Sequence, residues 1–563
     1  MLERYVSSLE FDSYADFYER FKVSAPDTFN FAYDVMDALA ESKPREQALV
    51  WCDERGAEAR FTYYDLKILS DRALHCLAAN GIRAGDPVML ILKRRWEYWP
   101  VLLALHKIGA VAIPATHLLT AKDIAYRREA AAVAGIISVD DPEVLRRVEE
   151  SEEALGPLRF KAFARSGGGG AAPETRGWVD VTACMEREDA APPPGRRFFN
   201  KSGDPMLLYF TSGTTGFPKM VRHTFSYPLG HILTARYWQG VEPGGLHFTV
   251  AETGWAKAAW GKIYGQWLCG SAVFVYDFDR FVPAALLEII SAYRITTFCA
   301  PPTIYRFFVK EDLRKYDFSA LKRCAVAGEP LNPEIYEQFK AATGIALREA
   351  YGQTELTVVM GTFPWLTPKP GSMGKPAPGY DVALMRDDGT LCDMGEEGEI
   401  VIRTDRMKPA GMFDGYYRDA ALTERVWRGG VYYTGDMAWR DEDGYYWFVG
   451  RADDVIKSSG YRIGPFEVES ALLEHPAVLE CAVTGVPDPD RGAAVKATVV
   501  LAKGWEAGEE LKAALQNHVK KTTAPYKYPR IVEFVSELPK TISGKIRRVQ
   551  IRAQPPQPSP TVS

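Results

Sequence analysis

The chain has 563 residues, which exceeds the size of one hydrophobic core and predicts at least two domains. Its apolar content of 47% is that of a globular protein, and a net charge of −5 without a basic block argues against a nucleic-acid partner. No apolar run is long enough for an integral membrane segment, and the start has no signal core. The eight cysteines and eight histidines form no CxxC or HExxH motif, which argues against a disulfide framework or a zinc site and favours a reducing, cytoplasmic location.

The first part of the chain alternates between strand and helix patterns after a mixed start of about 45 residues. Strands are predicted at 88–92, 110–114 and 136–139, and an apolar helix at 98–108. This alternation is typical of a parallel sheet with helical crossovers. Two stretches rich in glycine or proline, at 166–173 and 191–195, are expected to divide two halves of a large domain.

The alternation resumes after these breaks. Strands are predicted at 206–210, 246–250, 272–276, 296–299, 322–326 and 346–350, and an amphipathic helix at 281–293. From about 360 to 450 the pattern changes to short strands with many turn residues, for example at 398–403, which suggests a small β-barrel or sandwich. The predicted fold class is therefore α/β, with two parallel-sheet subdomains and a β subdomain in a large domain over 1–452.

The remaining chain reads as a separate small α+β domain over 453–552. Helices are predicted at 465–475 and 509–521, and strands at 479–486 and 495–501. The proline-rich tail, 553–563, has no means of packing and is expected to be disordered.

The most informative segment is 209–219, Tyr-Phe-Thr-Ser-Gly-Thr-Thr-Gly-Phe-Pro-Lys, at the end of a buried strand. Glycines let the backbone approach a ligand closely, and hydroxyl groups with one lysine add donors and positive charge. This pattern predicts a polyphosphate site, although it is not a Walker A loop. A plain surface turn would explain a shorter match. The candidate residues are Thr211, Ser212, Gly213, Thr214, Thr215, Gly216 and Lys219.

Four further motifs follow in order. Gly328-Glu-Pro330 follows a strand, and Tyr351-Gly-Gln-Thr-Glu355 combines a hydroxyl with a carboxylate of the kind that Mg²⁺ prefers. Asp436 follows a tight turn, where a carboxylate could accept hydrogen bonds from both hydroxyls of a ribose. A lone aspartate there would be interpreted as a turn cap, but the surrounding motifs outweigh that interpretation. The string from Gly450 to Gly464 carries paired aspartates, which by themselves would fit an exposed linker between domains.

Together these motifs resemble those of the adenylate-forming superfamily, which includes acyl-CoA synthetases, peptide-synthetase adenylation domains and luciferases. The matches follow the family's order along almost the whole chain and end at Lys545, and they are most similar to the short- and medium-chain acyl-CoA synthetases. The resemblance implies that the chain joins a carboxylic acid, ATP and coenzyme A, with Mg²⁺ as a cofactor. A monomer or small homo-oligomer is expected.

The resemblance also implies roles for individual residues. Lys545 would be the catalytic lysine, helped by Thr354, Arg462 and the Mg²⁺ ligand Glu355. Asp453 would be the hinge about which the small domain rotates, and Ser459, Gly460, Tyr461 and Arg462 would meet coenzyme A. Besides the phosphate loop, the expected ATP contacts are Gly328, Glu329, Pro330, Glu349, Ala350, Tyr351, Gly352, Gln353, Thr354, Asp436 and Arg451. Lys540, Arg547 and Arg548 are expected to be solvated.

The acyl pocket is expected to involve Trp255, Ala256, Lys257, Trp260, Ala327 and Gly352. Acetate-restricted relatives carry tryptophan at the position of Gly352, so a glycine should open a volume for a longer acid, of about four to eight carbons. Lys257 and Trp260 could cap or redirect that space.

Several alternatives remain open at this point. An aryl- or benzoate-CoA ligase would use the same reaction with a flat pocket. A carrier-loading adenylation domain is less well supported, because no carrier-like serine motif follows Lys545. A luciferase-like oxygenase has no positive feature here, and the presence of Lys545, Glu355 and Asp436 argues against a nucleotide sensor without turnover.

Overall fold

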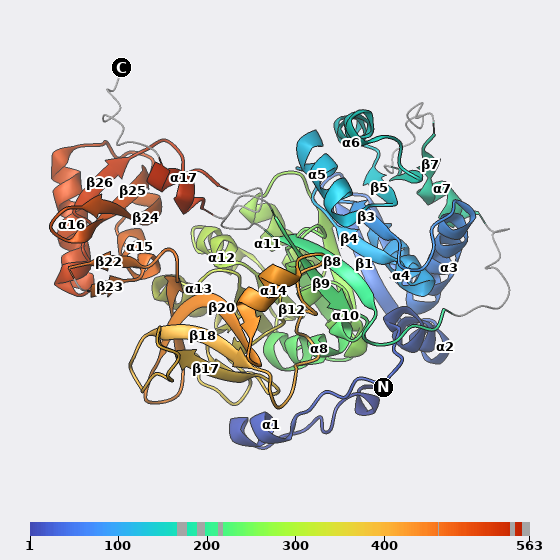
Figure 1. Ribbon diagram of the computed structural model, residues 1–563, viewed down its shortest axis with the longest axis horizontal. Helices are drawn as coiled ribbons and strands as arrows, with labels where there is room; N and C mark the ends of the chain where they lie inside the picture. The colour runs from blue at the N-terminus through green and yellow to red at the C-terminus, as the bar shows by residue number, and fades with distance from the viewer. Residues whose placement is uncertain (166–176, 188–197, 212–217, 460, 541–545, 554–563) are drawn as a thin grey trace.

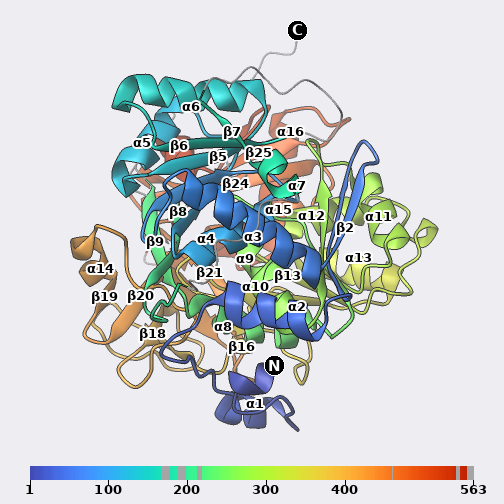
Figure 2. The same cartoon turned by 90° about the vertical axis from the view of Figure 1, so that its right-hand side faces the viewer.

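The computed structural model describes residues 1–165, 177–187, 198–211, 218–459, 461–540 and 546–553. The large domain fills most of the molecule, and the small domain lies at one end of the long axis, opposite the first sheet (Figure 1). Short elements at the N-terminus, including α1 (Tyr14–Arg20) and α2 (Ala38–Ser42), lie against the large domain (Figure 2).

The first sheet has the strand order β7-β6-β5-β3-β4-β8-β9 among the described residues, and all neighbours are parallel except β8 and β9. Helix α4 begins at Tyr98 and ends at Ile108, as predicted, because Gly109 adopts a left-handed φ of 80°. The strands are β3 (Pro87–Ile91), β4 (Val111–Pro114), β5 (Gly135–Val139), β6 (Phe160–Ala164), β7 (Val179–Asp180), β8 (Pro205–Thr211) and β9 (Lys219–Thr224). The helices are α3 (Tyr63–Ala79), α4, α5 (Ala121–Ala131), α6 (Pro142–Leu155) and α7 (Val181–Glu186).

The second sheet has the order β16-β15-β14-β13-β12-β10-β11-β1-β2. Its strands are β1 (Gln47–Asp53), β2 (Glu58–Thr62), β10 (Leu246–Thr249), β11 (Ala272–Asp277), β12 (Thr297–Ala300), β13 (Arg323–Ala327), β14 (Leu347–Tyr351), β15 (Met360–Gly361) and β16 (Lys375–Pro376). Its helices are α8 (Tyr227–Leu233), α9 (Lys257–Gly261), α10 (Tyr264–Leu268), α11 (Pro283–Ala292), α12 (Pro302–Phe308) and α13 (Pro333–Thr343).

The breaks at 166–173 and 191–195 lie outside the described residues, and they do not divide the two sheets. Strand β1 pairs with β11 in the second sheet, whereas β8 and β9, which follow both breaks, belong to the first. The expected division was therefore wrong, because the chain crosses between the sheets twice and no local signal marks such a crossover.

The β subdomain is an antiparallel sheet of β17 (Asp381–Met385), β18 (Gly398–Arg403), β19 (Trp427–Arg428), β20 (Val431–Arg440) and β21 (Tyr446–Arg451), with α14 (Ala420–Val426). Strand β20 pairs with β18, β19 and β21, and register shifts break both of its longer ladders. Within the described chain no pairing closes this sheet, so the predicted β subdomain is an open sheet. The long β20 is the strand with which β18, β19 and β21 all pair.

The small domain is α+β, as predicted. Strands β24 (Val478–Asp488), β25 (Gly492–Leu501) and β26 (Ile531–Phe534) form one sheet, and β22 (Ile456–Ser458) with β23 (Tyr461–Ile463) form a hairpin. Helices α15 (Pro465–Leu473) and α16 (Glu509–Thr522) pack on the sheet, and α17 (Arg548–Ala553) follows near the C-terminus (Figure 1).

Candidate active site

The predicted phosphate loop connects β8 to β9. Thr211 and Lys219 are paired across this hairpin, and residues 212–217 between them lie outside the described structure. The Lys219 Nζ lies 5.5 Å from the centre of the Tyr416 ring. Burial lowers the pKa of Lys219, and the nearby Glu355 carboxylate acts in the opposite direction. The one described cation of the loop is therefore next to the Tyr351–Glu355 motif.

Asp436 lies at the centre of a second group, the Asp436 cluster, which consists of Asp436, Tyr351, Gln353 and Arg451. The Tyr351 hydroxyl and the Gln353 amide each donate to Asp436 Oδ2 over 2.6 Å. Arg451 is the cross-strand partner of Asp436, and its Nη1 lies 3.5 Å from Asp436 Oδ1. The carboxylate is buried, at 5% exposure, so it has few ways to move. This cluster joins two motifs that are 85 residues apart in the chain.

Glu355 and Thr354 are fixed by two residues that sequence reasoning missed. The Tyr416 hydroxyl donates to Glu355 Oε1 over 2.8 Å, and the His223 Nε2 lies 2.7 Å from the carbonyl oxygen of Thr354. Burial lowers the pKa of His223 to about 3, so the ring is neutral and Nε2 is the donor. Neither residue belongs to a recognisable motif. Their contacts form only where β9 packs against the β subdomain, so the sequence alone could not predict them.

Glu349 holds the residue that follows the Gly328-Glu-Pro330 turn. Glu349 accepts hydrogen bonds from the backbone N–H groups of Leu331, over 3.1 Å, and of Gly371, over 2.7 Å. Burial raises the pKa of Glu349 to about 8. The Glu349 carboxyl group thus accepts from backbone N–H groups and holds the turn in place, and its predicted contact with ATP stays a prediction. Ala350 follows it on β14, and Gly328 has a φ of 108° that only glycine adopts easily.

Among the predicted acyl-pocket residues, Lys257 contacts Ala327 and Trp260 lies beside Gly352, but the space expected at Gly352 is filled. A Cβ added to Gly352 would lie 2.5 Å from Cη2 of Trp260 and 2.2 Å from the Thr357 carbonyl oxygen. Trp260 is 6% exposed and packs edge-on against Trp238. The glycine therefore accommodates the indole of Trp260 instead of opening a volume, which corrects the prediction for this residue.

Other residues of the predicted pocket lie beside this contact. The Lys257 Nζ donates to the carbonyl oxygen of Ala327, at the end of β13. Trp255 and Ala256 precede α9 and are partly exposed. These contacts therefore bring α9 next to the ends of β13 and β14.

The hinge region contacts the end of the chain. Asp453 Oδ1 lies 3.7 Å from Arg451 Nε, and the Asp453 carbonyl accepts from Arg552 Nη1 over 3.1 Å. Arg548 makes two hydrogen bonds, over 2.6 and 2.7 Å, to the carboxylate of the buried Glu469. Arg548 is therefore not solvated as expected, because it anchors α17 to α15. Lys540 also has a partner, Glu480.

The predicted coenzyme A residues lie in the β22–β23 hairpin. The half-exposed Tyr461 stacks on Tyr526 with ring centres 4.1 Å apart, and Ser459 has a φ of 50°. The Arg462 Nη2 donates to Asp387 Oδ2 of the large domain over 2.6 Å. Arg462 thus pairs with the β subdomain and not with the Asp436 cluster. Gly460 and Lys545 lie outside the described residues.

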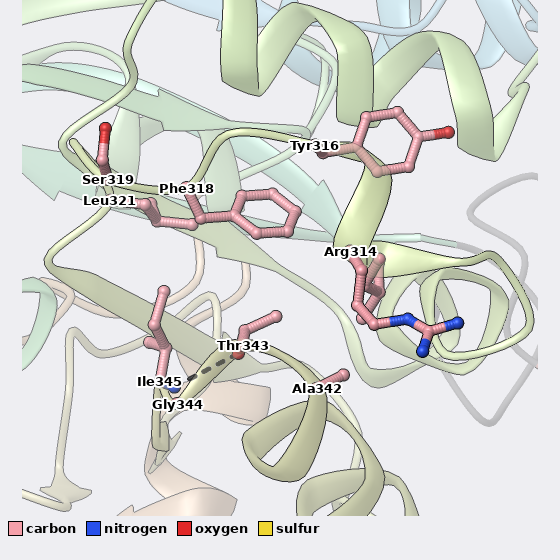
Figure 3. A pocket seen from close by; sticks show the side chains of 10 residues that line it. Arg314, Tyr316, Phe318, Ser319, Leu321, Ala342, Thr343, Gly344 and Ile345 are labelled. Atoms are coloured by element: carbon pink, nitrogen blue, oxygen red, sulfur yellow. Dashed lines mark hydrogen bonds between the residues drawn. The ribbon is translucent and has the colours of Figure 1, made fainter.

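Two further observations concern where a pocket and a metal ion could lie. The hollow in Figure 3, of about 410 Å³, is lined by residues between Leu313 and Ile345, and none of them belongs to the predicted site. Across the described ranges, no group of three metal-ligating side chains gathers in one place. A Mg²⁺ ion that takes one carboxylate and its remaining ligands from phosphates and water needs no such group, and Glu355 fits that role.

Comparison with known proteins identifies the family of this chain. A profile described as "AMP-binding enzyme" matches residues 36–417, and one described as "AMP-binding enzyme C-terminal domain" matches residues 467–545. The chain is 41% identical over 553 residues to acyl-coenzyme A synthetase ACSM3, mitochondrial, of Mus musculus, covering 96% of this chain and 93% of that protein. This protein belongs to the acyl-coenzyme A synthetases of the AMP-binding enzyme family. The predicted superfamily and fold class are confirmed.

Other similarities extend this assignment. Human acyl-coenzyme A synthetase ACSM4, mitochondrial, is 43% identical over 94% of this chain and 91% of its own length. The crystal structure of an acyl-CoA synthetase from Brucella canis is similar with a TM-score of 0.73 and 32% identity, over 96% of this chain and 99% of that one. The anthranilate CoA ligase AuaEII, in complex with anthranoyl-AMP, has a TM-score of 0.84 and 27% identity, over 94% and 98% of the two chains. None of the described helices is long and apolar enough to span a bilayer.

Proposed function

We propose that this synthetase activates a carboxylic acid of about four to eight carbons and transfers it to coenzyme A. The acid's carboxylate oxygen attacks the α-phosphorus of ATP, the bond to pyrophosphate breaks, and an acyl adenylate forms. The thiol of coenzyme A then attacks the acyl carbon, and AMP leaves. The observation that carries the proposal is the convergence of Asp436, Tyr351, Glu355 and Lys219 from separate motifs into one place.

The Asp436 cluster is suited to a ribose. Asp436 accepts from two neutral side-chain donors, and a diol could take over those hydrogen bonds while Arg451 keeps the carboxylate charged. Tyr351 would then be released toward the adenine, on which its ring is proposed to stack. Glu349 holds the Gly328–Pro330 turn that would face the base.

The phosphates need positive charge, because both reactants of the first step are anions. Lys219, at the end of the phosphate loop, and Lys545 are proposed to supply it, and Thr354 adds a hydroxyl. Glu355 would hold Mg²⁺, which neutralises charge on the phosphate oxygens when it is bound. Tyr416 fixes one carboxylate oxygen of Glu355 and so sets the direction in which the other faces.

Rotation at Asp453 is proposed to exchange the two faces of the small domain between the steps. Lys545 is needed only in the first, and Ser459–Arg462 only in the second. The ends of the 541–545 segment are joined, since Lys540 and Ile546 form an antiparallel bridge and α17 is anchored by Arg548 and Arg552. These contacts support a small domain that moves as one body.

The acyl group is proposed to enter between α9 and β13, with Trp260 as the limit of the pocket. An aryl acid is the second candidate, because a flat ring could stack on an indole and because a benzoate CoA ligase from Burkholderia xenovorans LB400 shares this fold, with a TM-score of 0.79 and 26% identity over 93% of this chain and 100% of that one. A monomer or small oligomer in the cytoplasm remains our prediction, although the mammalian relatives carry mitochondrial names.

The deciding experiment is a panel of straight, branched, cyclic and aromatic acids with ATP and Mg²⁺, scored by AMP release with and without coenzyme A. A C4 to C8 acid should give the highest coenzyme A-dependent rate. A preference for benzoates would select the aryl alternative. The absence of coenzyme A-dependent AMP release with every acid would refute the proposal.

A further inference from the structure

Two cysteines of the first subdomain face each other. Cys76 lies on α3 and Cys184 on α7, and their sulfur atoms are 2.9 Å apart. In the part of the chain that the structure describes, this is the one pair of thiols in hydrogen-bond contact, and both cysteines are free. The pair lies outside the candidate active site, and none of the residues assigned to catalysis belongs to it.

The two helices are held together by contacts that do not involve sulfur. Arg72, one turn before Cys76, donates from Nη1 to the carbonyl oxygen of Met185 over 3.0 Å. Thr182 also ties α7 to the start of α4, where it donates to Glu97 Oε1 over 3.1 Å, and both side chains are buried. The backbones on either side of the two cysteines are therefore fixed, so the short distance between the sulfur atoms does not depend on a mobile loop.

The two thiols differ in access and in charge. Cys76 is buried, at 6% exposure, whereas Cys184 is partly exposed. The Cys76 thiol donates its hydrogen to the Cys184 sulfur, and this hydrogen bond lowers the pKa of Cys184 below its ordinary value. The accessible sulfur is thus also the one that carries thiolate character, which is the arrangement of an attacking thiol with a resolving partner behind it.

We propose that Cys76 and Cys184 form a reversible intramolecular disulfide when the protein meets a peroxide. The Cys184 thiolate attacks one peroxide oxygen, the O–O bond breaks, and a sulfenic acid forms at Cys184 with loss of water. The Cys76 sulfur then attacks that sulfenic sulfur, the S–O bond breaks, and a second water leaves. The peroxide is reduced by two electrons and the two thiols are oxidised. A dithiol reductant reverses the reaction by thiol–disulfide exchange.

The structure needs little change for this step. A disulfide bond is about 2.0 Å long, so the sulfur atoms must approach by roughly 1 Å, which side-chain torsions can provide. The bond would close a long loop that contains β3, α4 and β4 of the first sheet. Cross-linking such a loop restricts the unfolded chain, so the oxidised protein should be more stable than the reduced one.

The test uses the full-length, fully reduced protein and hydrogen peroxide. After treatment, the protein is denatured in an alkylating reagent, its thiols are counted, and its peptides are mapped. We expect the loss of two thiols, a cross-linked peptide pair containing Cys76 and Cys184, and an unfolding temperature that is several degrees higher and returns with dithiothreitol. The change should not depend on ATP or on any acid, so it can succeed or fail separately from the proposed function.

Serine variants provide the controls. C184S should retain all its remaining thiols under the same peroxide dose, and C76S should lose only the Cys184 thiol, as a sulfenic acid, without a cross-link. C324S, which alters a buried cysteine on β13, should still form the cross-link. C184S changes a partly exposed side chain and should fold even if C76S does not. Oxidation of Cys184 to sulfinic acid without a cross-link, or the same loss of two thiols in C184S, would overturn the proposal.

Discussion

The large domain and its junction with the small domain hold their polar groups in different ways. In the large domain, Asp436 is 5% exposed and accepts hydrogen bonds from two side chains over 2.6 Å each. At the junction, Arg462 forms an ion pair with Asp387, whose side chain is 77% exposed. A buried network has fixed partners and strong hydrogen bonds, whereas an exposed ion pair is screened by solvent.

This difference matches what a two-step reaction requires of each part. The nucleotide must find the same geometry in both steps, so its contacts benefit from being built in advance. The small domain must leave one position and take another, so breaking its contacts with the large domain should require little free energy. Inside the small domain, however, the buried Glu469 is paired with the half-buried Arg548, so the domain that moves is itself held firmly together.

The largest effect is expected at Lys545, the residue whose role depends on domain position. Lys545→Ala removes one positive charge from the developing pyrophosphate and should slow adenylate formation by about 10²- to 10³-fold. Thioester formation from supplied acyl adenylate should be almost unchanged. The measurement is ATP–pyrophosphate exchange beside a single-turnover thioester assay. Equal losses in the two assays would show that Lys545 does not act in the first step alone.

A large effect is also expected at Asp436, because its contacts are buried. Asp436→Asn keeps the shape but removes the charge that accepts from the ribose, and hydrogen bonds to charged groups contribute about 1.5–3 kcal/mol. The KM for ATP should rise roughly 10- to 100-fold, and the KM for the acid should change little. Asp443→Asn is a matched control, because Asp443 is exposed and pairs with Lys369. An unchanged KM for ATP would remove Asp436 from the nucleotide site.

Trp260 tests whether the large domain also sets the acid's length. Trp260→Ala should lengthen the pocket, and since one methylene changes specificity about 10- to 200-fold in an apolar pocket, the ratio of kcat/KM for decanoate over butyrate should rise at least about tenfold. Removing a buried indole costs about 3–5 kcal/mol, so folding is checked by circular dichroism. Trp505→Ala, at an exposed position in the small domain, is the control. The same ratio in both variants would place the acyl chain elsewhere.

The sequence predicted local elements better than their assembly. Helix 98–108 and strand 398–403 were placed correctly, because apolar periodicity and a terminal glycine are local signals. The pairing of β1 with β11 could not be predicted, since it joins segments more than 200 residues apart and leaves no trace in either. The same limit applies to Tyr416 and His223, whose partners are set by packing.

Gly352 shows a subtler limit. Its identity differs from that in acetate-restricted relatives, and this suggested an open pocket. The residue that decides the matter is Trp260, which is 92 positions away and fills the direction that a side chain at 352 would take. One residue type at one position therefore does not define a volume. The volume depends on the second residue that faces it.

Glu349 should make stability depend on pH. Burial raises its pKa to about 8, so between the ordinary carboxyl range and pH 8 the folded state binds a proton that the unfolded state has lost. Stability from this group is therefore present at low pH and is lost as pH rises through that window, by up to about 1.4 kcal/mol per pH unit. Glu349→Gln should remove this slope. Denaturant unfolding of both proteins from pH 5 to pH 8 provides the measurement, and parallel curves would contradict it.

The smallest effect is expected at Asp387, the exposed partner of Arg462. Asp387→Asn removes an ion pair between the domains, and exposed pairs contribute about 0.2–1 kcal/mol. If this contact favours the present arrangement, the variant should form thioester up to about fivefold faster relative to adenylate, with no change in the KM for ATP.

Because ionic strength screens exposed charges, the difference from the unaltered protein should shrink as salt rises from 0.05 to about 0.5 M. A loss comparable to that of Asp436→Asn would mean that the junction is as fixed as the nucleotide site, and the contrast between the two regions would fail. A salt-independent change would instead indicate a role for Asp387 other than pairing with Arg462.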